Sequence, residues 1–169
     1  MRAKDASEVI GVLAHETGHI AGGHLIRSTQ ALKNASASTI LGYILGGAAV
    51  IAGRPDVGAA VISGSQNAAI RTYLKFSRTQ ESAADRAAVR YLDQTRQSST
   101  GMLAFMKTLG EQELLSVSRQ DAYVRTHPLT RDRIGFLEHH VSRSRFTNVP
   151  TPEKFKKAHA RMVAKLRAF

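Results

Sequence analysis

Two histidines and a glutamate stand close together near the start of the chain, in the run His15-Glu16-Thr17-Gly18-His19. Apart from this run, residues 9–20 are mostly apolar, which favours a helix. On a helix His15 and His19 lie one turn apart on one face, so their imidazoles can take two corners of a tetrahedral zinc site. Glu16 lies beside them, where a carboxylate can accept a proton from an activated water and pass it to a leaving amine. This H-E-x-x-H spacing is typical of zinc peptidases, although two unrelated histidines on a surface helix would give the same letters.

A catalytic zinc with two histidine ligands needs a third ligand from the protein. His24 does not fit the metzincin pattern, which would place its last histidine at position 25, where the chain has leucine. We therefore expect His24 to pack in the protein or to lie beside the ligands. The residues alone leave open the candidates Glu81, Asp85, Asp93, Glu111, Glu113, His127, His139 and His140.

Glu81 is favoured among these candidates because it lies on an alanine-rich helix face that can approach the first helix closely. Asp85 lies one turn further on and can accept the free ring N–H of a ligating histidine, which would fix the tautomer of that histidine. An ordinary amphipathic helix with a surface glutamate and aspartate fits this stretch equally well.

The amino-acid composition limits the kinds of metal site and binding partner that the chain can have. The chain has no cysteine, which excludes disulfides and thiolate zinc sites and leaves histidine and carboxylate ligands. Its net charge is +11, and residues 119–169 hold twelve Lys or Arg against four Asp or Glu. Such a field favours an anionic surface or an acidic partner, while a solvated basic face is an equally good interpretation.

The apolar periodicity predicts a mainly α protein, and we find no internal repeat and no strand pattern. Residues 36–66 form an apolar stretch around a turn, which predicts a helical hairpin. This hairpin is expected either to be buried against another part of the protein or to lie on a membrane or a partner protein. The other expected helices run from a cap at Asp5 or Ser7 to about Arg27, from Ser77, from Met102 to Leu109, from a cap at Thr130 through Val141, and from Glu153 to Ala168.

Three motifs occur in order: Ile10 to Leu25, Glu81 to Asp85, and Thr126 to Leu129 followed by Arg133-Ile134. Together they resemble metallopeptidase family 48, the gluzincin family that contains HtpX, the CAAX prenyl proteases and the periplasmic BepA-like proteases. The BepA-like branch is the most similar, over nearly the whole chain. The resemblance implies a zincin-like helical core with little or no sheet.

The resemblance also implies a role for each matching residue. His15, His19 and Glu81 would bind one Zn²⁺, Glu16 would be the catalytic base, and Asp85 would orient a ligating histidine. His127 would lie close to the metal as a second catalytic residue, either stabilising the oxyanion or plugging the site.

The predicted domains are a zinc metallopeptidase domain over 1–149, with 36–66 as an apolar insertion, and a linker with a basic helix over 150–169. The resemblance implies a fragment that lacks an upstream segment and a C-terminal tetratricopeptide-repeat domain. No signal peptide is visible, yet the family implies the periplasm or membrane of a Gram-negative bacterium.

The expected function is a zinc metalloendopeptidase in cell-envelope protein quality control. Its expected substrates are unfolded or misassembled envelope proteins, with membrane-surface contact through 36–66 and no nucleic acid. The alternative is a non-enzymatic basic helical module that binds an anionic surface or partner and carries a vestigial metal site.

Overall fold

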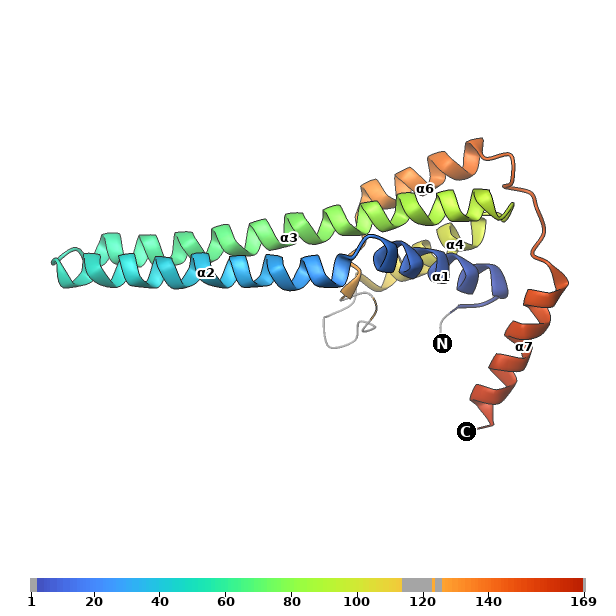
Figure 1. Cartoon of the computed structure of the whole chain (residues 1–169), viewed down its shortest axis with the longest axis horizontal. Helices are drawn as coiled ribbons and strands as arrows, with labels where there is room; N and C mark the ends of the chain where they lie inside the picture. Colours follow the sequence, from blue (N-terminus) through green and yellow to red (C-terminus); the bar gives the residue numbers. More distant parts are fainter. Residues whose placement is uncertain (1–2, 114–122, 124–125, 169) are drawn as a thin grey trace. The chain divides into compact units, whose positions relative to one another are not determined.

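The computed structural model describes residues 3–113, 123 and 126–168, and every regular element in these residues is a helix. The predicted mainly α fold is therefore confirmed. The helices are α1 Ala6–Ala21, α2 His24–Ile51, α3 Pro55–Gln94, α4 Thr100–Glu113, α6 Arg131–Arg143 and α7 Glu153–Arg167 (Figure 1).

The chain forms two compact units. One unit consists of Gly23–Gln80, which holds α2 and the first part of α3. The other consists of Met1–Gly22 together with Glu81–Phe169, and it holds α1, the rest of α3 and the later helices. The predicted division at residue 149 stays a prediction.

The predicted apolar hairpin is present, and it is longer than residues 36–66. In the unit Gly23–Gln80, α2 and the first part of α3 run side by side, joined by a turn in which Gly53 has φ 78° (Figure 1). Small residues let the two backbones approach closely. A Cβ on Gly46 would lie 2.8 Å from the carbonyl oxygen of Gly58, so alanine there would force the helices apart.

Two predicted helix boundaries are wrong. The first helix ends at Ala21 and not near Arg27, because Gly23 adopts a left-handed conformation with φ 61° and a new helix begins at His24. His24 is buried at the start of α2.

The helix predicted from Ser77 begins instead at Pro55, a residue that suits the first position of a helix. Glycines and serines lower the helix propensity of residues 58–65, and packing against α2 offsets this loss.

The core of the other unit lies where α3, α4 and α6 meet. It contains Ala88, Val89, Leu92, Met102, Phe105, Met106, Leu109, Leu129 and Leu137. Gly11 brings α1 onto α4, since a Cβ there would lie 2.7 Å from the Cα of Met102. Asp5 caps α1 by accepting hydrogen bonds from the backbone N–H groups of Ser7 and Glu8, and Thr130 caps α6, as predicted.

Candidate metal centre

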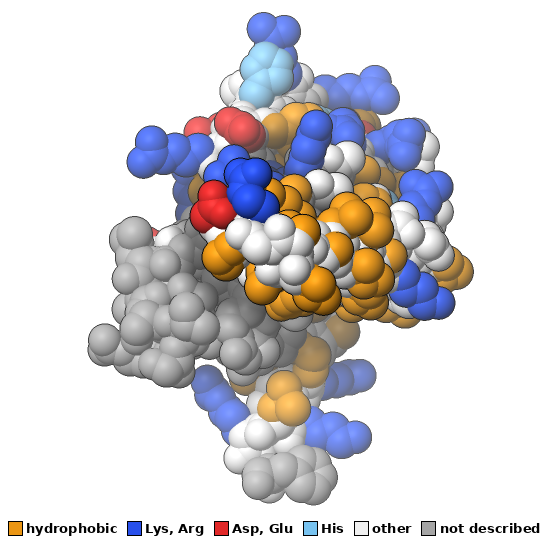
Figure 2. Space-filling view, turned by 90° about the vertical axis from the view of Figure 1, so that its left-hand side faces the viewer, with side chains coloured by type: hydrophobic (Ala, Val, Ile, Leu, Met, Phe, Trp, Pro, Cys, Tyr) orange, Lys and Arg blue, Asp and Glu red, His pale blue; other side chains and the backbone are white. Residues whose placement is uncertain are grey.

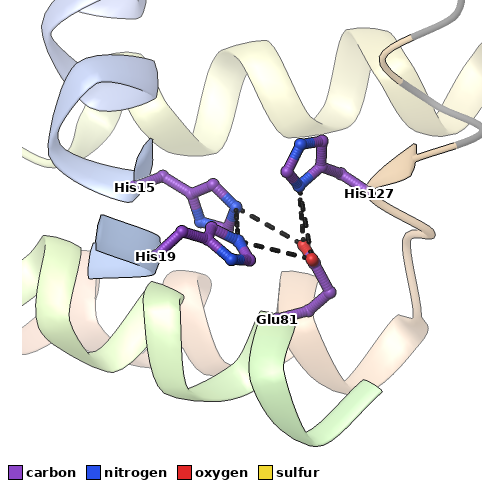
Figure 3. A group of neighbouring side chains, drawn as sticks. All are labelled: His15, His19, Glu81 and His127. Atoms are coloured by element: carbon purple, nitrogen blue, oxygen red, sulfur yellow. Dashed lines mark hydrogen bonds and ion pairs between the residues drawn. The ribbon is translucent and has the colours of Figure 1, made fainter. Parts of the chain in front are cut away.

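Four side chains from three separate segments converge in the unit that holds α1 (Figure 3). His15 and His19 come from α1, Glu81 from α3, and His127 from the segment that precedes α6. Each offers one ligand atom, and the four atoms all lie within 4.8 Å of one another. His15 and Glu81 are buried, and the other two are partly buried.

The spacing of these atoms fits a tetrahedral zinc. Zinc at about 2.1 Å from each ligand sets neighbouring ligand atoms about 3.4 Å apart. The Nε2 atoms of His15 and His19 are 3.0 Å apart. In the Glu81 carboxylate, Oε2 lies 3.4 Å from the first of these atoms and Oε1 lies 3.3 Å from the second. Nitrogen and carboxylate oxygen are also ligands that zinc takes, so the donor set and its spacing both fit this metal.

Close packing of α1 on α3 makes this convergence possible. A Cβ on Gly18 would lie 2.8 Å from the carbonyl oxygen of Ala84 and 3.2 Å from the Cβ of Ala87. Both alanines are buried. The glycine inside the H-E-x-x-H run and the alanines after Glu81 therefore let the two helices that carry the candidate ligands touch, as the alanine-rich face predicted.

Asp85 contacts the far nitrogen of His15. The Oδ1 atom of Asp85 lies 2.9 Å from Nδ1 of His15, on the opposite side of the ring from the Nε2 atom that faces Glu81. Burial alone would lower the pKa of His15, but the carboxylates of Asp85 and Glu81 outweigh it and the pKa is raised. Asp85 stands apart from the four grouped ligand atoms and contacts the Nδ1 side of the His15 ring.

Arg133 holds the two carboxylates in place. Its guanidinium donates two hydrogen bonds to Asp85, from Nε at 2.6 Å and from Nη2 at 2.9 Å. Its Nη1 lies 3.0 Å from Oε2 of Glu81 and donates to the carbonyl oxygen of Pro128 at 2.8 Å. One buried side chain on α6 thus ties α3 to the segment that carries His127.

Both carboxylates stay ionised although they are buried. Burial alone would raise the pKa of Glu81, but His127, His15 and His19, with Arg133, hold it well below its usual range. The pKa of Asp85 is also lowered, because its bonds with Arg133 and His15 outweigh burial.

Glu16 lies beside the cluster and is partly open to solvent, with 37% of its side chain exposed. The hydroxyl of Tyr123 donates to its Oε1 atom at 2.9 Å. Burial and the nearby Glu16 carboxylate raise the pKa of Tyr123, which therefore keeps its proton and remains a donor. The ring of Tyr123 stacks on His127 with centroids 4.4 Å apart.

The structure separates the candidates for a third ligand. Glu81 and His127 lie in the cluster, and Asp85 lies behind it. Asp93 instead contacts His140 at 3.3 Å and accepts a hydrogen bond from Ser144, while Glu111 and His139 are exposed. The side chain of Glu113 lies outside the described residues.

Two residues at the site were not assigned roles from the sequence. Arg133 belongs to the third motif, so its position in that motif was the available signal. Tyr123 has no signal of its own, because a lone tyrosine 107 residues away from Glu16 forms no local pattern.

Comparisons with known proteins agree with the resemblance that the three sequence motifs indicate. The sequence pattern of Peptidase family M48 matches residues 1–141, and the chain belongs to this family. It is similar to the beta-barrel assembly-enhancing protease of Escherichia coli (strain K12), with 27% identity over 155 residues that cover 92% of this chain and 31% of that protein. The protein of the same name from Yersinia pestis is 30% identical over 129 residues, which cover 76% of this chain and 26% of that protein.

The chain thus spans less than a third of the length of these curated relatives. No solved structure matches it. The predicted family resemblance is confirmed.

Proposed function

We propose that this chain is the catalytic core of a zinc-dependent metalloendopeptidase. One observation carries the proposal: His15, His19 and Glu81 form a triangle of ligand groups. The two Nε2 atoms are 3.0 Å apart, Oε2 of Glu81 lies 3.4 Å from that of His15, and Oε1 of Glu81 lies 3.3 Å from that of His19. These edges match those of a tetrahedral zinc site, and Glu16 stands next to them in the sequence order that zinc peptidases require. Membership of Peptidase family M48 supports the same function.

His15, His19 and Glu81 would hold the metal, and Asp85 would keep the His15 ring in the orientation that presents Nε2. When bound, zinc would supply a Lewis acid that lowers the pKa of water and polarises a peptide carbonyl. Glu16 would accept the proton that this water loses and pass it to the leaving amine. Tyr123 binds one oxygen of the Glu16 carboxylate, which leaves the other oxygen available for proton transfer.

His127 would plug the site in the resting state. A catalytic zinc site keeps one position open, whereas a site with four protein ligands is closed. The ring of His127 brings a fourth ligand atom into the cluster, with Nδ1 only 3.2 Å from Oε2 of Glu81. For water and substrate to enter, this ring would have to leave, and it could then act on the oxyanion of the substrate.

The substrates would be unfolded or misassembled proteins of the cell envelope, with the protein in the periplasm of a Gram-negative bacterium. Support comes from the similar proteins, which are named as beta-barrel assembly-enhancing proteases. The cluster is partly exposed on the side of Glu16, where an extended polypeptide can reach it.

The test is turnover of casein, an unfolded protein, by the purified chain. We expect turnover by the wild type and none by Glu16→Gln, with equal zinc content in the two proteins. Asp132→Asn, which changes an exposed carboxylate on α6, is the matched control and should keep full activity. Turnover that survives Glu16→Gln would contradict the mechanism. Zinc binding without any turnover, in wild type and in His127→Ala alike, would favour the alternative of a non-enzymatic basic module.

A further inference from the structure

The hairpin of α2 and the first part of α3 carries its large apolar side chains on the outside. Ile40, Leu41, Tyr43, Ile44 and Leu45 are each at least 50% exposed. Figure 2 faces the turn of the hairpin and shows hydrophobic side chains gathered at this end. An exposed apolar surface of this kind marks contact with a partner or a membrane.

The apolar side chains cover every face of α2 that α3 leaves free. At 100° per residue, Leu41 and Leu45 point to one side of the helix, Tyr43 and Val50 to the opposite side, and Ile44 between them. Only the face of Gly42 and Gly46 is buried. A helix that docks on a protein presents one apolar stripe, whereas a helix that is apolar all round suits lipid.

The uncharged part of α2 has nearly the length of a bilayer's hydrocarbon core, and the uncharged part of α3 is shorter. On α2 no charged residue occurs from Asn34 to the end of the helix at Ile51, which is 18 residues or about 27 Å of helix. On α3 none occurs between Asp56 and Arg71, which is 14 residues or about 21 Å. The hydrocarbon core of a bilayer is about 30 Å thick. By length and composition α2 could cross a membrane, and only 11% of its most apolar window is buried.

The interior of the hairpin also suits lipid. Its backbones meet through Gly42 against Ser65 and through Gly46 against Gly58, and small residues of this kind let helices associate in membranes. The polar side chains satisfy their own hydrogen bonds. Ser63 and Ser65 donate to the carbonyl oxygens of Ala59 and Ile62 on the preceding turn, at 2.9 and 2.8 Å.

Charge distinguishes the two ends of the hairpin. Its base carries only cations, at Arg27, Lys33, Arg71, Lys75 and Arg78. Asp56 is the only acidic residue in 23–80, and it lies at the turn, 3.7 Å from Arg54. The basic residues at the end far from the turn are complementary to the anionic headgroups of a membrane, and the uncharged residues between them and the turn suit its hydrocarbon core.

We propose that this hairpin inserts into a bilayer that contains anionic lipids, with the Gly53 turn entering first and the basic residues of the base staying among the headgroups. The inference goes beyond the peptidase function and does not rest on it. Its readouts involve neither zinc nor turnover, so failure of one proposal leaves the other standing.

Vesicle flotation of the full chain tests the proposal. The chain should float with vesicles of phosphatidylethanolamine and phosphatidylglycerol, float less with pure phosphatidylcholine, and stay bound at high salt because apolar contacts hold it. Ile44→Asp should lower partitioning by about a hundred-fold, since a carboxylate is costly within the hydrocarbon region. Leu166→Asp is the matched control, because Leu166 is 59% exposed on α7 and should lie outside the bilayer.

The depth of insertion into the bilayer is measured with a single fluorophore. It can be attached to one introduced cysteine because the chain has no cysteine of its own. A fluorophore on Ile44→Cys should be quenched more by nitroxides on the acyl chains than by nitroxides on the headgroups, and a fluorophore on Leu166→Cys should not. Three results would overturn the proposal: no flotation with anionic vesicles, binding that high salt abolishes, or equal losses in the two aspartate variants. Self-association without lipid that Ile44→Asp disrupts, in a chain that does not float, would assign the surface to a second copy instead.

Discussion

Arg133 donates two parallel hydrogen bonds to the carboxylate of Asp85, from Nε to Oδ2 and from Nη2 to Oδ1. Both side chains are almost fully buried, with 2% and 1% exposed. A bidentate pair of this kind fixes direction as well as charge, because the planar guanidinium matches the carboxylate. Asp85 in turn contacts Nδ1 of His15, so the orientation of a candidate metal ligand on α1 depends on an arginine on α6.

The first prediction concerns the removal of Arg133. Arg133→Met leaves the Asp85 carboxylate buried without its main partner and should lower the free energy of unfolding by about 3–5 kcal/mol. Arg133→Lys should lower the free energy of unfolding less, because lysine keeps the positive charge and loses only the planar two-donor geometry of the guanidinium. Urea unfolding without metal, followed by circular dichroism, measures both. Unchanged midpoints in Arg133→Met would show that the pair contributes nothing to folding.

The second prediction is that Asp85 acts on a bound metal through its contact with His15. Asp85→Asn should keep the zinc site but weaken zinc binding by roughly ten- to a hundred-fold, as changes to the partner of a ligating histidine do. Competition with a chelating indicator measures the affinity. Asp93→Asn is the control, because Asp93 pairs with His140 and contacts none of the grouped ligands. Complete loss of zinc in Asp85→Asn would make Asp85 a ligand itself.

Local patterns were enough to predict that the chain is mainly helical, to place two helix caps, and to predict the part of the site that lies on α1. The spacing of His15 and His19 fixes their common face once the helix forms, and the caps at Asp5 and Thr130 depend on neighbouring residues alone. The pairing of Glu81 with these histidines is not local. It depends on Gly18 meeting Ala84 across two helices, and the family resemblance supplied what spacing could not.

Other features could not be predicted because they depend on distant contacts. Tyr123 reaches Glu16 only after segments 107 residues apart fold together. The start of α3 at Pro55 was missed because the glycines and serines that follow are poor helix formers on their own, and α2 supplies the packing that keeps them helical. The early end of α1 depends on the positive φ of Gly23, which a glycine permits but does not require.

The third prediction is that the purified protein binds about one zinc per chain through His15, His19 and Glu81. Glu81→Ala removes one corner of the triangle and should cost much of the affinity. Metal content after dialysis measures it. Glu111→Ala and His139→Ala are controls, because both side chains are exposed and lie apart from the cluster. If Glu81→Ala kept its zinc while either control lost it, the assignment of Glu81 as the third ligand would be wrong.

The fourth prediction concerns the contact between α1 and α3. In Gly18→Ala the new methyl group meets the backbone of Ala84 at 2.8 Å, so the helices must separate and the ligand triangle must widen. We expect a loss of stability of about 1–3 kcal/mol, as for other overpacked sites, together with weaker zinc binding. Gly135→Ala on α6 is the matched control, because nothing lies within 4 Å of its added Cβ and alanine favours a helix. Equal stability and zinc affinity in the two variants would mean that the contact between α1 and α3 accommodates the added methyl group.

The last prediction concerns His127, which lies between two carboxylates. Its Nδ1 is 3.2 Å from Oε2 of Glu81, and its Nε2 is 3.7 Å from Oε1 of Glu16. Pro128 restricts the backbone of His127 to extended conformations, and Arg133 binds the carbonyl oxygen of Pro128. The ring is therefore held among the candidate ligands, and as the proposed plug it would take the position that a catalytic zinc keeps open.

The two functional roles of His127 predict opposite changes in turnover. If the ring plugs the resting site, His127→Ala opens the fourth position and casein turnover should rise, with zinc retained by the other three ligands. If the ring acts mainly on the oxyanion, His127→Ala should lower turnover by about a hundred-fold, again with zinc retained. We expect the rise, because the four ligand atoms lie within 4.8 Å of one another and a zinc held by all four would have no open position. The measurement is casein turnover by wild type and His127→Ala, with zinc content determined for both. Equal turnover would remove both roles and leave His127 as a packing residue stacked on Tyr123.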